Sequence, residues 1–72
     1  MSDTLSPRGK AVLLLVGEGK SNKEIGEQLY ISEATVKRNI SSAISKLGAN
    51  DRTNALILAL KRGLIILDEI NT

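Results

Sequence analysis

The stretch SNKEIGEQLYISEATVKRNI, residues 21–40, contains two serines that each precede a segment with helical spacing of apolar residues. Ser21 and Glu24 form the pattern of a capping box, in which each side chain accepts a hydrogen bond from a backbone amide of the other residue. Ser32 is followed by Glu33, whose negative charge suits the positive end of a helix dipole. The stretch therefore predicts two helices joined by a short break.

Residues typical of helix starts and helix ends elsewhere in the sequence predict that the whole chain is all-α. Ser6 and Pro7 combine an N-cap with a residue preset for the first helical position. Glycines after the apolar segments provide helix ends, and no segment alternates as a strand does. The predicted helices cover about residues 7–18, 22–29, 33–47 and 52–62, and the last is capped by Asn50 or Asp51.

Composition limits the function. The 72 residues suit one domain, predicted as residues 1–72 with a core at about 5–65 and terminal tails at 1–4 and 66–72. Cys and His are absent, which removes disulfides, the commonest metal ligands and the commonest catalytic groups, so we expect neither an enzyme nor a cofactor. No apolar run reaches the about 18 residues of a membrane span, and no signal-peptide pattern opens the chain. A cytoplasmic protein is the default expectation.

The third predicted helix sorts its residues by face. At about 100° per residue, its apolar side chains gather on one side, namely Val36, Ile40, Ala43, Ile44 and Leu47. The opposite side holds Ala34, Arg38, Ser41 and Ser45, flanked by Lys37 and Ser42. The net charge is only +2, so the position of the cations, rather than their number, indicates nucleic-acid binding.

A solvated face is the ordinary explanation for such a pattern. Here, however, a short helix and a tight break precede a Ser-capped helix that carries cations in its first two turns, as a helix-turn-helix requires. Small side chains on this face allow close approach, and Arg, Lys and Ser can contact base edges. We predict Lys37, Arg38 and Ser41 as base-reading residues.

Other polar residues are predicted to bind phosphate without reading sequence. Helix N-terminal amides and short polar or cationic side chains commonly hold the DNA backbone. The predicted set is Asn22, Lys23, Thr35, Asn39 and Lys46. For Lys46, simple solvation is an equal alternative. Gly26, within the second predicted helix, is expected to mark close helix packing.

Four segments, in order, resemble the LuxR-type (GerE-type) helix-turn-helix domain of bacterial transcription regulators. They are LSPR at 5–8, GKSNKEIGEQLYISEATVK at 19–37, KLGANDRTNAL at 46–56 and RGLI at 62–65. The resemblance implies a four-helix domain whose third helix enters the major groove and whose fourth commonly pairs two subunits. It places Lys37, Arg38 and Ser41 at base-reading positions.

The resemblance also implies phosphate contacts at Lys23, Thr35 and Asn39, although Asn39 replaces a common His. Gly9 and Ala11 replace glutamates usual in the first helix, which bears on the stability of that helix. The chain looks like a stand-alone regulator of the GerE type. The alternative is an excised output domain of a larger two-component response regulator.

The fourth predicted helix has more apolar residues than one core face needs. Ala55, Leu56, Ala59 and Leu60 can face the core. Ile57, Leu58 and Lys61 then point outward, which predicts a homodimer interface. Alternatively, the tail residues Ile65, Ile66, Leu67 and Ile70 cover this patch.

A symmetric dimer would bind double-stranded DNA with inverted half-sites about 10 base pairs apart. The competing function is a helix-turn-helix used for protein contact, on RNA polymerase or a sensor.

Overall fold

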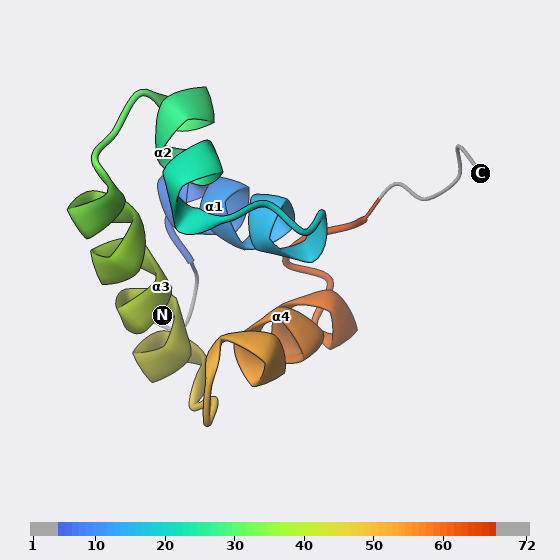
Figure 1. Cartoon of the computed structure of the whole chain (residues 1–72). Helices are drawn as coiled ribbons and strands as arrows, with labels where there is room; N and C mark the ends of the chain where they lie inside the picture. The colour runs from blue at the N-terminus through green and yellow to red at the C-terminus, as the bar shows by residue number, and fades with distance from the viewer. Residues whose placement is uncertain (1–4, 68–72) are drawn as a thin grey trace.

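The computed structural model describes residues 5–67, and these form four α-helices with no strand among them (Figure 1). The helices are α1 Pro7–Gly17, α2 Asn22–Leu29, α3 Glu33–Leu47 and α4 Arg52–Lys61. The predicted all-α fold class is confirmed. α1 and α4 each end one residue before the predicted end, because Glu18 and Arg62 are C-caps with φ of −87° and −90° and ψ near 0°.

Side-chain caps start every one of these helices. Ser6 Oγ accepts from the Gly9 amide at 3.0 Å, and the equivalent serine bonds begin α2 and α3. Asp51, rather than Asn50, caps α4 by accepting from the Asn54 amide at 2.8 Å. Each bond satisfies an amide that has no partner within the helix, so the helix starts are fixed by residues three apart in the sequence.

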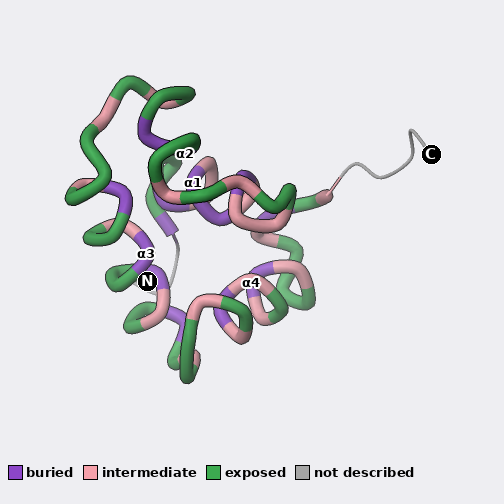
Figure 2. The backbone as a smooth tube through the Cα atoms, viewed as in Figure 1, coloured by how far each residue is buried: buried purple, intermediate pink, exposed green. Residues whose placement is uncertain are grey.

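α3 lies at the centre of the packing and contacts each of the other three helices. One buried cluster joins α1, α3 and α4 with the segments just before α1 and just after α4: Leu5, Leu13, Ala43, Leu47, Ala55, Ala59 and Ile65. A second joins α1, α2 and α3: Val12, Leu15, Ile25, Val36 and Ile40. Ile44 packs against both. Figure 2 shows buried and exposed residues alternating along α3, as its sequence periodicity predicts.

The segment after α4 returns to the body of the domain. Ile65 is buried in the first cluster, and the Leu67 side chain lies beside Gly17 at the end of α1. Ile66 is 78% exposed, while Ile70 lies outside the described residues. The segment after α4 therefore contributes to the core through Ile65 and places Leu67 beside α1, whereas Ile66 remains open to solvent.

Candidate nucleic-acid interface

α2 and α3 pack against each other and are joined by a short connection, which forms a tight corner. The Ser21 and Glu24 capping box is complete, with Ser21 Oγ accepting from the Glu24 amide at 3.1 Å and Glu24 Oε1 accepting from the Ser21 amide at 2.8 Å. That backbone hydrogen bond, aided by the Ser21 side chain and the Lys20 charge, lowers the pKa of Glu24. The capping box thus stabilises the N-terminus of α2, although this helix has only 8 residues.

The turn itself depends on Tyr30 and Gly26. Tyr30 has left-handed backbone angles, φ 59° and ψ 44°, and its side chain is 94% exposed. A Cβ on Gly26 would lie 2.6 Å from the Ile31 carbonyl oxygen, so only glycine lets the turn fold back this tightly. The predicted close contact at Gly26 exists: the nearest atom belongs to the turn at Ile31, and the backbone at the start of α3 follows, with Glu33 N 3.7 Å from that Cβ position.

The predicted base-reading residues lie together on the outer side of α3. Lys37, Arg38 and Ser41 are exposed, while Val36 and Ile40 are buried beneath them. Fully burying such apolar side chains contributes about 1.5–3 kcal/mol each, which holds the helix in place without using its outer face. The outer face is completed by exposed small or polar residues: Ala34, Ser42 and Ser45.

Three predicted phosphate-binding residues share one flank of α3. Taking Arg38 as zero and about 100° per residue, Thr35, Lys46 and Asn39 fall at about 60°, 80° and 100°. Lys46 is exposed, whereas Thr35 and Asn39 are half-buried. Asn39 Nδ2 donates to the Thr35 carbonyl at 2.9 Å, so this flank is already ordered by its own hydrogen bonds.

The other two predicted phosphate-binding residues lie at the start of α2. Lys23 is exposed and reaches solvent freely. Asn22 is half-buried, and its Oδ1 is enclosed without a hydrogen-bond partner. An amide carbonyl oxygen carries no hydrogen to donate, so any phosphate contact from Asn22 has to come from its side-chain NH₂ or its backbone N–H.

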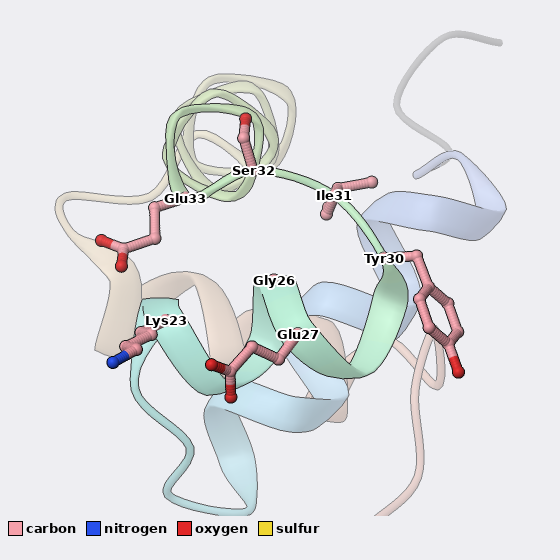
Figure 3. Close-up of a pocket in the computed structure, with 7 residues that line it drawn as sticks. All are labelled: Lys23, Gly26, Glu27, Tyr30, Ile31, Ser32 and Glu33. Carbon is pink, nitrogen blue, oxygen red and sulfur yellow. The ribbon is translucent and has the colours of Figure 1, made fainter.

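A hollow of about 490 Å³ lies at the corner, between the outer side of α2 and the start of α3 (Figure 3). It is lined by Lys23, Gly26, Glu27, Tyr30, Ile31, Ser32 and Glu33. In Figure 3 the Glu27 and Glu33 carboxylates lie on the same side as Lys23, and Tyr30 stands at the opposite end. Because the Glu27 and Glu33 carboxylates repel an anion inside the hollow, a phosphate bound by Lys23 would have to lie outside it.

The predicted dimer surface on α4 is mixed. Ile57 is 43% exposed and Lys61 is exposed. Leu58 differs from the expectation that it points outward, because it is half-buried and packs against the first core cluster. The open apolar surface of α4 therefore centres on Ile57. Sequence periodicity did not predict the partial burial of Leu58, because α4 is apolar on most of its circumference.

Residues 5–67 contain neither a helix able to span a membrane nor a cluster of metal-binding side chains. None of the helices there is long and apolar enough to cross a membrane. The same residues contain no cluster of three or more acidic, His or Cys side chains that could hold a metal ion.

The short α2, the tight turn and the exposed polar face of α3 define the helix-turn-helix class. Residues 3–59 match the family described as bacterial regulatory proteins of the luxR family, GerE. This chain therefore belongs to the luxR family of bacterial regulatory proteins and has its four-helix, helix-turn-helix domain. The resemblance found in the sequence motifs is confirmed.

Individual relatives agree with this assignment. Transcriptional regulatory protein LiaR of Bacillus subtilis (strain 168) is 44% identical over 63 residues, covering 88% of this chain and 30% of LiaR. DegU of Brevibacillus brevis is 46% identical over 61 residues, covering 85% of this chain and 26% of DegU. The chain thus spans less than a third of these regulators. The solved structure of transcription factor GerE has a TM-score of 0.86 and 39% identity, covering 89% of this chain and 96% of that one.

Proposed function

We propose that this domain binds double-stranded DNA in a sequence-specific manner by placing the N-terminal part of α3 in the major groove. The observation that carries this proposal is the division of α3, with Val36 and Ile40 buried, Arg38 exposed on the opposite side and Lys37 exposed at its flank. Arg and Lys donate hydrogen bonds to guanine in the major groove, and Ser41 offers a hydroxyl one turn further on. The small Ala34 keeps the helix axis close to the bases.

The phosphate contacts flank this reading face. Thr35, Asn39 and Lys46 occupy one side of α3, and Asn22 and Lys23 lie at the first turn of α2. The free amides at the start of α2 add affinity for phosphate without added charge. Together these groups would hold the backbone on either side of the groove that α3 enters, which fixes the register of the base contacts.

We further propose a symmetric homodimer formed through α4, around Ile57 and Lys61 with the exposed part of Leu58. A monomer with few cations on its reading face makes few phosphate contacts, and pairing doubles both those contacts and the length of sequence read. Two inverted half-sites about 10 base pairs apart fit this arrangement. The same mode of binding applies whether the chain acts alone or as the output segment of a longer response regulator.

Selection of bound sequences from a random DNA pool tests DNA reading, symmetry and spacing together. On the selected duplex, Lys37→Ala and Arg38→Ala should each weaken binding by about 1–3 kcal/mol and relax specificity at the contacted base pair. Lys46→Ala should weaken binding to all sequences and reduce the salt dependence. Arg8→Ala, which removes an exposed cation from α1, is the matched control and should change binding least.

Unchanged selectivity in both Lys37→Ala and Arg38→Ala would contradict the proposal. It would favour a different reading face, whereas a wild-type chain with no sequence selectivity would favour the competing function, a helix-turn-helix that docks on a protein such as RNA polymerase or a sensor.

A further inference from the structure

Ser32 makes a hydrogen bond that its capping role does not require. Its Oγ accepts from the Thr35 amide at 3.1 Å, which is the ordinary N-cap bond. The same hydroxyl also donates to Thr35 Oγ1 at 3.0 Å. The residues at the equivalent third position of α1, α2 and α4 are Gly9, Glu24 and Asn54, so only α3 has a hydroxyl there.

The bond to Oγ1 sets the direction of the Thr35 hydroxyl. A hydroxyl has one hydrogen, and because Oγ1 accepts from Ser32, that hydrogen is directed away from Ser32. The Thr35 side chain is β-branched and half-buried, and the Thr35 carbonyl is also held by Asn39 Nδ2 at 2.9 Å. Thr35 is thus tied at its amide, carbonyl and hydroxyl oxygen, and its O–H remains free to donate.

We propose that Ser32 is a positioning residue for DNA binding, because its hydroxyl directs the Thr35 O–H toward a phosphate oxygen of the DNA backbone. This rests on the proposed function, in which the flank of α3 bearing Thr35 faces a phosphate. The hydrogen bond received from Ser32 polarises the Thr35 hydroxyl and makes it a stronger donor. Ser32 itself contacts no DNA and acts through Thr35.

A double-mutant cycle tests this coupling. Ser32→Gly removes the hydroxyl but keeps an acceptable N-cap residue, and Thr35→Val removes Oγ1 with little change in shape. Each single variant should weaken binding about three- to tenfold, on the selected duplex and on a random duplex alike, because a phosphate contact reads no sequence. The double variant should bind no more weakly than Thr35→Val. Ser32→Thr, which keeps the hydroxyl, should retain wild-type affinity.

Thermal unfolding of every variant separates this effect from loss of fold, since binding is compared only at temperatures where all are folded. A double variant whose loss equals the product of the two single losses would overturn the proposal, as would a Ser32→Gly variant with unchanged affinity. A wild-type chain that binds no duplex would overturn the proposed function as well. If the wild type binds DNA but the effects of Ser32→Gly and Thr35→Val are independent, only the proposed role of Ser32 is contradicted.

Discussion

Two glycines lie against neighbouring segments, and they meet different kinds of atoms. At the corner, a Cβ on Gly26 would lie 2.6 Å from the carbonyl oxygen of Ile31. At the end of α1, a Cβ on Gly17 would lie 2.8 Å from Leu67 Cδ2 and 3.2 Å from Leu56 Cδ1. Backbone cannot move aside without rebuilding the turn, whereas leucine methyl groups can rotate away. The angle between α2 and α3 is therefore fixed, while the contact between α1 and the C-terminal segment is adjustable.

Gly26→Ala should produce the largest effect, a loss of about 2 kcal/mol of unfolding free energy. The clash with the Ile31 carbonyl should cost about 1–3 kcal/mol or more, as other overpacked substitutions do. The better helix propensity of alanine offsets only part of this cost. Urea unfolding followed by far-ultraviolet circular dichroism measures the change. Because α3 is held by this turn, affinity for the selected duplex should fall as well.

Gly17→Ala is the matched control for this variant. It adds the same methyl group to a helix, but the atoms it meets are the ends of the Leu67 and Leu56 side chains. Its cost should stay below that of Gly26→Ala and within about 1 kcal/mol. Equal losses in the two variants would show that the corner is no more rigid than the C-terminal contact.

Ile57→Asp tests the proposed dimer surface on α4. Ile57 is 43% exposed on α4, so a charge there should leave the fold largely intact but should weaken self-association by about 2 kcal/mol, as expected for a central interface residue. Sedimentation of the protein with a duplex carrying two half-sites measures the number of bound subunits. Ile66→Asp, on the more exposed residue outside α4, is the control and should have the smaller effect. A wild-type chain that binds only as a monomer would contradict the proposed dimer.

The helix starts and the faces of α3 could be predicted because their causes are local. An N-cap bond joins residues three apart, and burial of Val36 and Ile40 follows from helical periodicity. The stretch of residues 21–40 therefore predicted the bounds of α2 and the start of α3 correctly, and Gly48 predicted the end of α3. The same spacing of three, from Ser32 to Thr35, could also have indicated the hydroxyl pair at the start of α3.

Other features depend on contacts that no local pattern contains. Tyr30 occupies a left-handed conformation where Gly or Asn is more usual, because the turn must bring Ile31 back toward Gly26. The packing of Leu67 beside Gly17 joins the end of α1 to a segment far away in the sequence. Leu58 was predicted to point outward, but α4 is apolar on so many sides that periodicity could not select its buried face.

The smallest expected effect is a pH dependence of the capping box at the start of α2. The backbone hydrogen bond from Ser21 lowers the pKa of Glu24, so the carboxylate binds a proton less readily in the folded chain than in the unfolded one. Its stabilisation is therefore complete above the ordinary glutamate pKa and is lost as the pH falls through the lowered value.

Glu24→Gln isolates this contribution, because a glutamine side chain can accept the Ser21 hydrogen bond without titrating. Wild type should be slightly more stable than Glu24→Gln at neutral pH, and thermal unfolding at successive pH values should show that advantage disappearing in acid. Glu27→Gln, which removes an exposed acid from the same helix, controls for the change in net charge. If the advantage of wild type over Glu24→Gln stayed constant with pH, the corner would owe its stability to the Gly26 contact and the N-cap of α3, not to the charge of its first turn.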